Sequence, residues 1–393
     1  MFVAADAGPL VELLREANIP ITELSANVRH PSRKTGRVLR KAIESNRIEL
    51  VCTTGFNMTL DAVPAALLSG VPLFPTYPGL FLPPYPQPWL PRVNVFSEEL
   101  SGHLVQRHGW EADTFCNLIA RIDGSRFNDK VNGSNFRDEL KIPKSTFVLT
   151  MVCRQDKIKQ GGIQTLLDAS MELKRLIPEL AIVFFGDGPS RYKILERIGE
   201  LNKSAGSTFL FSPGATRNTP EAYAMADVII ANGARSAMEG MACGKPVISV
   251  GPNGFCGVIT ERSVASFRRF NFDKGRLLDN PIGSTENLLN AINVLYSDKE
   301  MRRSLGEFSA RYAGGQLLVQ TAGSAYERIY ESILKSASRD WPWKKIMFRW
   351  TKSVFFFYWQ RVKGIFSREA ATWRERLAPP VRGVEPEWEA GLL

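Results

Sequence analysis

The sequence predicts an α/β fold in which two domains each carry a doubly wound parallel sheet, followed by a helical tail. Short, continuous apolar runs alternate with amphipathic stretches for most of the chain. Such runs are typical of parallel strands that helices cover on both faces, and the alternation predicts strand–helix–strand units. At 393 residues the chain is long enough for two separate hydrophobic cores.

Eight apolar runs are predicted as strands. They are Ile48–Cys52, Val71–Phe74, Val93–Phe96, Phe147–Val152, Ala181–Phe185, Thr208–Phe211, Val228–Ile230 and Pro246–Val250. Helices are predicted for the amphipathic stretches Pro9–Ala17, Leu60–Leu68, Gly162–Leu176, Arg191–Leu201 and Arg235–Cys243. Two later helices, Thr285–Tyr296 and Ala325–Leu334, are expected to close the second domain.

The polar stretch Asn128–Lys144 separates two series of strands and helices. Such a stretch is typical of a linker between domains. We therefore expect an N-terminal domain over residues 1–140, a C-terminal domain over residues 141–338 and a tail over residues 339–393. The proline-dense segment Pro75–Pro91 predicts an ordered or semi-rigid surface loop.

Composition excludes several classes of protein. With 44% hydrophobic and 23% charged residues, the chain is neither collagen-like nor a disordered low-complexity chain. The five cysteines are scattered without a C-x-x-C pair, which favours reduced thiols in a cytosolic compartment. Only three histidines are present, so we expect no histidine-built metal site. The segment Met1–Asp6 lacks the features of a signal peptide, which also favours the cytoplasm.

The net charge of +10 is concentrated in the tail. No acid occurs between positions 344 and 368, and six of the eight tryptophans lie beyond Arg339. The cations of this stretch are Lys344, Lys345, Arg349, Lys352, Arg361, Lys363 and Arg368. The rest of the chain is therefore close to neutral, whereas a nucleic-acid-binding protein carries a basic face on its folded body. No nucleic-acid partner is expected.

A helical wheel of this stretch has an apolar stripe and a basic side. The stripe consists of Met347, Trp350, Val354, Phe357, Tyr358, Val362 and Ile365. Aromatic residues opposite Lys and Arg are typical of a helix that lies in a membrane interface, so residues 344–368 predict contact with an anionic membrane surface. The alternative is a C-terminal helix packed on its own protein. The longest apolar run, Val354–Trp359, is too short to span a bilayer.

Three segments carry residues suited to chemistry. In Val152–Gly162, the cations Arg154, Lys157 and Lys159 follow a strand end and precede a helix, a pattern that suits a diphosphate. An ordinary polar turn is the alternative. In Phe184–Pro189, glycines after a strand allow close backbone approach, either to a ligand or simply within a tight turn.

The third segment, Ala226–Val247, reads as strand, Asn-Gly, helix and strand. The helix N-terminus at Gly233–Ser236 is suited to a phosphate. Glu239 lies one turn further on, on the same face as Arg235 and Ser236, where a carboxylate can accept hydrogen bonds from a ribose diol. A solvated surface glutamate is the alternative, although the flanking methionines favour partial burial.

These motifs resemble those of the retaining glycosyltransferases of the GT-B fold (family 4, group 1 type). That family carries G-R-L-x-x-x-K-G, then G-D-G-P, then E-x7-E ending in E-A-M-A-x-G-K-P-V. Arg154 and Lys159 match the first motif, Gly186–Pro189 the second, and Glu239–Val247 the last. Val95–Glu99 and Ile122–Phe127 resemble two further family segments, so the resemblance covers about residues 8–335.

The resemblance implies a nucleotide-sugar donor, transfer with retention of configuration, and no metal or other cofactor. Arg154 and Lys159 would stabilise the diphosphate leaving group, and Glu239 would hold the ribose, which makes these three the expected catalytic residues. The residues expected to contact the nucleotide are Gly186, Asp187, Gly188, Gly233, Ala234, Arg235, Ser236 and Glu239.

The sequence also departs from the family pattern. Ala231 stands where the first glutamate of E-x7-E is expected. Gln160 stands where a glycine follows the lysine in the family, so Lys157 is expected to share the role of Lys159. Thr53–Asn57 and Tyr77–Gly79 replace segments that hold histidines in the family. The chain begins about where the family's second strand starts, so the opening strand and Gly-rich loop are expected to be missing.

We therefore expect a glycosyltransferase that moves a sugar from a nucleotide-sugar to a glycan or lipid-linked acceptor. Its expected location is the cytoplasm, peripherally associated with the inner face of the membrane. Two alternatives remain open. One is a catalytically inactive scaffold that binds a nucleotide or a protein partner, and the other is an epimerase of the same architecture.

Overall fold

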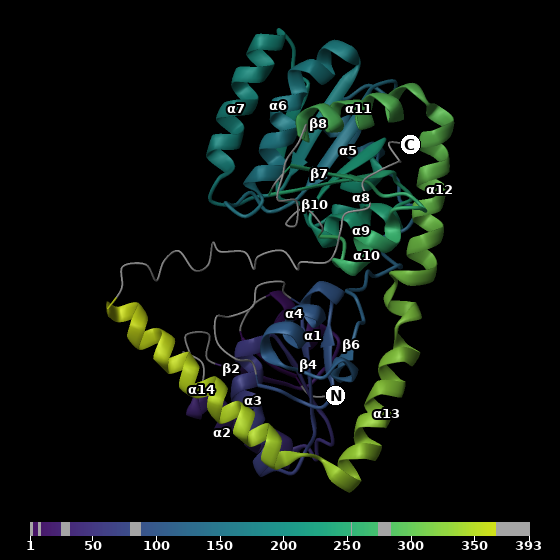
Figure 1. Cartoon of the computed structure of the whole chain (residues 1–393). Helices are drawn as coiled ribbons and strands as arrows, with labels where there is room; N and C mark the ends of the chain where they lie inside the picture. Colours follow the sequence, from purple (N-terminus) through teal and green to yellow (C-terminus); the bar gives the residue numbers. More distant parts are fainter. Residues whose placement is uncertain are drawn as a thin grey trace. The chain divides into compact units, whose positions relative to one another are not determined.

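The computed structural model describes residues 3–6, 9–24, 32–78, 88–252, 254–273 and 284–366. The chain forms two compact units. Unit 1 contains the described residues of Met1–Leu118 together with those from Ser324 onward, and unit 2 contains those of Ile119–Gly323. Figure 1 shows both, with unit 2 mainly in teal and green. Since the chain returns to unit 1 at its end, the units are not consecutive segments of sequence.

Unit 2 is built on a six-stranded sheet with the strand order β12-β11-β10-β7-β8-β9. All neighbouring pairs are parallel except β11 and β12. The strands are β7 (Phe147–Val152), β8 (Leu180–Phe185), β9 (Leu210–Gly214), β10 (Val228–Asn232), β11 (Val247–Gly251) and β12 (Gly254–Val258). The chain runs outward from β7 to β9, then crosses back and continues from β10 to β11. The order therefore reverses between β7 and β10.

Helices cover both faces of this sheet (Figure 1). They are α5 (Ser134–Glu139), α6 (Gln160–Leu176), α7 (Arg191–Ala205), α8 (Thr219–Ala224), α9 (Ala234–Ala242), α10 (Val264–Arg269), α11 (Ser284–Ser297) and α12 (Lys299–Gln316). Every residue of β8 is buried, as are all those of β10 and β11. This burial on both faces explains why the strands are continuously apolar, and it confirms the predicted doubly wound sheet.

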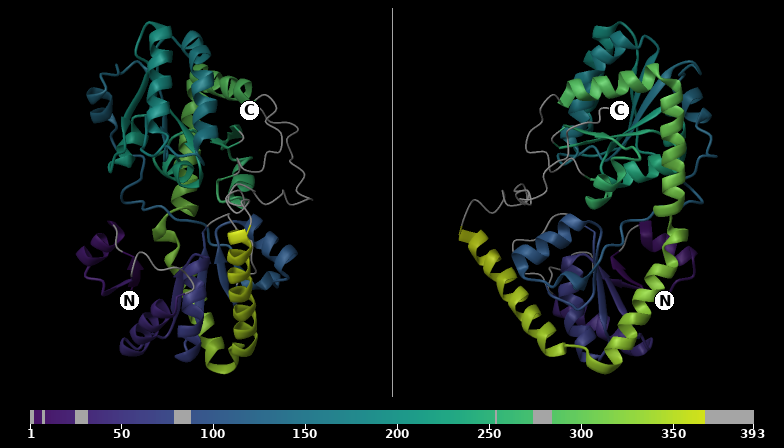
Figure 2. Two further views of the ribbon diagram at one scale, coloured as in Figure 1. Left: turned by 90° about the vertical axis from the view of Figure 1, so that its left-hand side faces the viewer. Right: turned by 45° about the vertical axis from the view of Figure 1, so that its right-hand side comes forward.

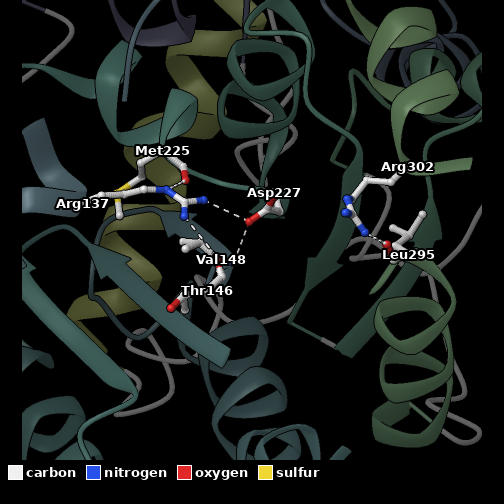
Figure 3. A network of polar contacts seen from close by, with 7 residues as sticks. All are labelled: Arg137, Thr146, Val148, Met225, Asp227, Leu295 and Arg302. Carbon is white, nitrogen blue, oxygen red and sulfur yellow. Dashed lines mark hydrogen bonds and ion pairs between the residues drawn. The ribbon is translucent and has the colours of Figure 1, made fainter. Parts of the chain in front are cut away.

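The stretch predicted as a linker is part of unit 2 instead. Its residues form α5, from which the Phe136 ring packs against Phe185 with centroids 5.0 Å apart. Arg137 donates hydrogen bonds to the carbonyl oxygens of Met225 and Thr146 and forms an ion pair of 3.0 Å with Asp227 (Figure 3). The predicted boundary at residue 140 is thus corrected to residue 118, because Phe136 and Arg137 pack on and bind residues of unit 2.

Unit 1 contains a four-stranded parallel sheet, β3-β4-β5-β6, and a separate parallel pair, β1-β2. The strands are β1 (Val3–Asp6), β2 (Ile21–Leu24), β3 (Val51–Thr54), β4 (Leu73–Tyr77), β5 (Val93–Val95) and β6 (Phe115–Cys116). The helices before residue 118 are α1 (Pro9–Glu16), α2 (Arg33–Ser45), α3 (Phe56–Leu68) and α4 (Glu98–His108).

Two late helices also belong to unit 1, namely α13 (Gly323–Asp340) and α14 (Trp343–Phe366). Ile333 of α13 and Ile346 of α14 are fully buried in the same hydrophobic cluster as Phe74 and Tyr77. The helix predicted at Ala325–Leu334 therefore closes the first unit and not the second, and the tail predicted from residue 339 starts inside a packed core. Its residues 367–393 lie outside the described part.

The eight predicted strands are confirmed as β3, β4, β5 and β7–β11, with ends displaced by up to three residues. The strands β1, β2, β6 and β12 were not predicted. Pro75, expected in a loop, lies within β4 and pairs with Thr53 of β3. Most of that proline-dense segment, residues 79–87, lies outside the described residues.

Candidate functional site

Three loops of unit 2 carry the residues singled out by the sequence. They follow β7, β8 and β10, so they lie at the carboxyl edge of the same parallel sheet. Between β7 and β10 the connections diverge to opposite sides, because the strand order reverses there. Such a point leaves a crevice at the strand ends, and ligands of doubly wound sheets bind there.

The carboxylate of Asp156 orders the loop between β7 and α6. Asp156 Oδ1 accepts hydrogen bonds from the backbone N–H groups of Ile158 and Lys159, at 3.0 and 3.1 Å. Its other oxygen lies 3.3 Å from the guanidinium of Arg154. The Arg154 side chain is 74% exposed, so its single ion pair leaves most of its donors open to solvent. Arg154 is therefore oriented by Asp156 but accessible.

Lys159 is held against the loop that follows β10. Its carbonyl oxygen accepts a hydrogen bond of 2.7 Å from Asn232 Nδ2. Its ammonium lies over Gly233, where the Cβ of any larger residue would overlap it. Lys157, by contrast, is exposed two residues earlier. The structure thus brings Lys159 to the strand reversal, together with the glycine that precedes α9.

The N-terminus of α9 faces this lysine. Gly233 has φ = +120°, a conformation that favours glycine, and it offers no side chain to cap the helix. Ser236 donates its hydroxyl hydrogen to the Gly233 carbonyl at 2.9 Å. The N–H groups of the first turn, including those of Ala234 and Arg235, have no partners within the helix and carry its positive dipole end. Lys159 and α9 therefore create a site for an anion.

Glu239 is buried one turn further along α9, with 8% of its surface exposed. Tyr223 of α8 donates a hydrogen bond of 2.9 Å to Oε2, and Arg235 Nε lies 3.4 Å from Oε1. Burial raises the pKa of Glu239, and the bond from Tyr223 and the charges of Arg235 and Arg126 oppose that rise. Burial also raises the pKa of Tyr223, so its hydroxyl remains a donor.

The loop after β8 packs on the loop after β7. The backbone N–H of Gln155 donates to the Asp187 carbonyl at 2.9 Å. Gly186 and Gly188 have φ of +143° and +153°, and a Cβ on either would collide with the backbone of Cys153 or Gln155. Close packing within unit 2 therefore accounts for both glycines. Contact of Gly186, Asp187 and Gly188 with a nucleotide stays a prediction.

Three residues near these loops were not singled out from the sequence. Tyr223 gives no local signal, because only the fold brings α8 beside Glu239. Asn232 and Gln155 are almost fully buried, and within the described residues the side-chain carbonyl oxygen of each has no hydrogen-bond partner. For both residues the sequence signal would have been an amide side chain at or just after the end of an apolar strand.

The site offers cations and hydrogen-bond donors, and its cysteine is unreactive. Burial raises the pKa of Cys153, which follows β7, to about 12, so the thiol is protonated at neutral pH and is no nucleophile. Among the residues that the structure describes, no three His, Cys, Asp or Glu side chains are grouped to hold a metal ion. The arrangement is suited to binding an anion beside a buried carboxylate.

Solved structures share this architecture. A glycosyltransferase from Rickettsia africae ESF-5 is 17% identical, with a TM-score of 0.70 over 85% of this chain and 90% of that one. HepE from Anabaena in complex with UDP is also 17% identical, with a TM-score of 0.65 over 84% of this chain and 92% of that one. HepE matches again in complexes with UDP and glucose and with UDP-glucose. The fold is GT-B.

A more distant match is the lipopolysaccharide outer core galactosyltransferase WaaB, 12% identical, with a TM-score of 0.56 over 84% of this chain and 99% of that one. In sequence, residues 133–311 match the family model described as glycosyl transferases group 1. No curated protein matches the chain. The matched residues include the loops after β7, β8 and β10. Together the sequence match and the GT-B fold support an enzyme that transfers glycosyl groups.

Proposed function

We propose that this protein transfers a sugar from a nucleotide-sugar donor to a lipid-linked or membrane-proximal glycan acceptor, with retention of configuration. The observation that carries the proposal is the strand reversal of unit 2. There the ammonium of Lys159 and the uncapped N-terminus of α9 meet, one turn from the buried carboxylate of Glu239. A cation beside a helix N-terminus suits a diphosphate, and a nearby carboxylate can accept hydrogen bonds from a ribose.

In the proposed reaction the glycosidic bond to the donor phosphate breaks, and negative charge develops on the leaving diphosphate. Lys159, Arg154 and the N–H groups of α9 stabilise that charge, without the divalent cation that other transferases use. Glu239 accepts hydrogen bonds from the ribose hydroxyls, and Tyr223 holds the carboxylate in place. The acceptor hydroxyl attacks the sugar from the face that the diphosphate leaves, and its proton passes to the departing phosphate oxygen, so the configuration is retained.

Two neighbours support the choice of donor and acceptor. HepE is described in complexes with UDP and UDP-glucose, which favours a uridine nucleotide. WaaB acts in the outer core of lipopolysaccharide, which favours an acceptor carried on lipid. None of the described helices combines the length and the apolar character needed to cross a bilayer. Because the proposed acceptor is carried on lipid, we propose peripheral association with the inner face of the membrane.

The test is transfer of labelled sugar from UDP-glucose and UDP-galactose to a lipid-linked oligosaccharide extract. Arg154→Ala and Glu239→Ala should each lower transfer by about a hundredfold or more, because each removes a donor contact. Arg197→Ala provides the control, since Arg197 is an exposed arginine on α7 that pairs only locally with Glu200. Unchanged transfer in both site variants would contradict the assignment.

A second candidate function is a scaffold that binds a nucleotide without transferring sugar. The observation in its favour is Ala231, which is fully buried in β10 and offers no polar group at the position of the family's first glutamate. Calorimetry with UDP separates the two functions. Binding of UDP without release of labelled sugar from any donor, in the presence of the lipid extract, would favour the scaffold.

A further inference from the structure

The helix α14 has two apolar faces. One faces unit 1, where Ile346, Ser353 and Phe357 are buried and Phe357 packs with Leu60 of α3. Trp350 lies on the same face and donates its indole N–H to the Leu60 carbonyl oxygen at 2.8 Å. Figure 2 shows α14 in yellow along unit 1. Much of the stripe that the helical wheel assigned to lipid, including Trp350, Val354 and Phe357, is therefore occupied by the protein itself.

The opposite face of α14 presents aromatic rings to solvent. Phe348, Phe355 and Trp359 are 70%, 61% and 47% exposed. No other phenylalanine or tryptophan in the described part of the chain is as exposed. At 3.6 residues per turn the three lie within about 40° of one another around the helix axis. They form one stripe, in which the rings of Phe355 and Trp359 stack with centroids 6.4 Å apart.

Cations flank this stripe on both sides. Lys344 and Lys352 are exposed and lie within about 40° of Phe348, one on each side. The sequence of α14 contains no acid that could neutralise them. Lys345 differs, because it forms an ion pair of 2.7 Å with Glu111 and lies 3.8 Å from the Trp89 ring. Lys345 thus fastens the helix to unit 1, whereas Lys344 and Lys352 face outward.

We propose that the stripe of Phe348, Phe355 and Trp359 is the surface that inserts into the interface of an anionic membrane. The helix then lies parallel to the bilayer, with its aromatic rings among the acyl chains and Lys344 and Lys352 at the lipid phosphates. This inference rests on the proposed function, which includes membrane association. It assigns the membrane contact to Phe348, Phe355 and Trp359, which the helical wheel of the sequence did not select.

The charge favours a membrane over other occupants. A second copy of the chain, placed on this face by two-fold symmetry, would bring Lys344 and Lys352 against the same cations, a repulsive arrangement. A nucleic acid would attract the lysines. Its grooves, however, offer no apolar layer for a central row of aromatic rings that has cations only at its sides. A bilayer interface supplies an apolar layer beneath a layer of phosphates and matches both.

The experiment is sedimentation of the full chain with vesicles of phosphatidylcholine containing phosphatidylglycerol, compared with phosphatidylcholine alone. Replacing the stripe in the triple variant Phe348→Ala/Phe355→Ala/Trp359→Ala should lower binding to anionic vesicles by at least about tenfold without lowering the melting temperature. Replacing both lysines, as Lys344→Gln/Lys352→Gln, should lower binding to anionic vesicles by about fivefold per lysine and leave binding to neutral vesicles unchanged.

The matched control is Tyr192→Ala, which removes an exposed aromatic ring that lies beside Lys193 on unit 2. This variant should sediment like the wild type. Arg154→Ala should also sediment like the wild type, so loss of donor chemistry is distinguishable from loss of membrane binding. The inference would be overturned if the wild type failed to bind anionic vesicles or if the triple variant bound them equally well. A change of the triple variant from dimer to monomer without loss of lipid binding would overturn it too.

Discussion

The helices α9 and α14 both carry charged side chains beside apolar ones, but the charged group is buried in α9 and exposed in α14. In α9 the carboxylate of Glu239 is buried and held by Tyr223 and Arg235 within unit 2. In α14 the ammonium groups of Lys344 and Lys352 are exposed, beside exposed aromatic rings. A charge that is buried with partners indicates a binding site, whereas unopposed charge at the surface indicates an external partner.

The two helices also differ in what their apolar faces contact. The apolar face of α9, including Met238 and Met241, is buried against the second sheet. In α14 one apolar face is buried on α3 and the other is exposed. An amphipathic pattern therefore does not by itself identify the side that faces solvent. The apolar stripe read from the sequence of α14 is largely buried, and aromatic rings outside that stripe are exposed. Five predictions test this contrast.

The largest effect is expected at the N-terminus of α9. Lys159→Ala should lower kcat for sugar transfer by about a hundredfold to a thousandfold, because it removes a cation from the developing diphosphate charge. Lys157→Ala should change kcat by less than about threefold, since the Lys157 side chain is exposed, whereas the ammonium of Lys159 lies over Gly233. Steady-state kinetics with the lipid-linked acceptor measures both. A larger loss in the Lys157 variant would reverse the assignment of the two lysines.

The next effect concerns the buried face of α14. Phe357→Ala should destabilise unit 1 by about 3 kcal/mol, because it leaves a cavity against Leu60. Phe355→Ala, on the exposed face of the same helix, should change stability by less than about 0.5 kcal/mol. Thermal denaturation of the two variants gives the comparison directly. Equal melting temperatures would show that α14 does not pack on α3 as described.

A smaller effect is expected for the partner of Glu239. Tyr223→Phe removes the hydroxyl that donates to the buried carboxylate and should weaken UDP binding by about fivefold, or about 1 kcal/mol. It should also raise the pKa of Glu239 further, because this hydrogen bond favours the ionised form. Calorimetry over a range of pH measures both changes. Tyr312→Phe, in the same unit, should alter neither and serves as the control.

The smallest effect is the dependence of UDP binding on pH. Burial places the pKa of Glu239 above the ordinary 4.5, and only the ionised carboxylate accepts hydrogen bonds from both ribose hydroxyls. Affinity for UDP should therefore fall as the pH is lowered from neutral through the raised pKa of Glu239. Glu239→Gln should show only the weaker dependence that arises from the phosphate of UDP itself. Identical profiles in the two proteins would exclude titration of Glu239.

The same shift has a consequence for stability, with the opposite sign. Because the pKa of Glu239 is higher in the folded state, the folded protein binds more protons between the ordinary and the raised pKa. The contribution of Glu239 to stability therefore falls as the pH rises through that window. Denaturation of the wild type and of Glu239→Gln at several pH values measures the difference.

The sequence alone determined the parallel sheets and most of the strand ends that carry the candidate site. The strands β7, β8, β10 and β11 were predictable because burial on both faces requires continuous apolar runs, and no tertiary information is needed to see them. Cations and glycines after those strands suggested a phosphate site. The resemblance to the GT-B family then selected Arg154, Lys159 and Glu239 as the expected site residues.

Tertiary structure alone decided which elements share a core and which side chains meet. The polar stretch around Arg137 belongs to unit 2, since Arg137 donates a hydrogen bond to the backbone carbonyl of Met225, 88 residues away along the chain. Tyr223 came beside Glu239 only through the packing of α8 on α9. The face of α14 that contacts protein was fixed by the surface of α3, and periodicity contains no information about a distant partner.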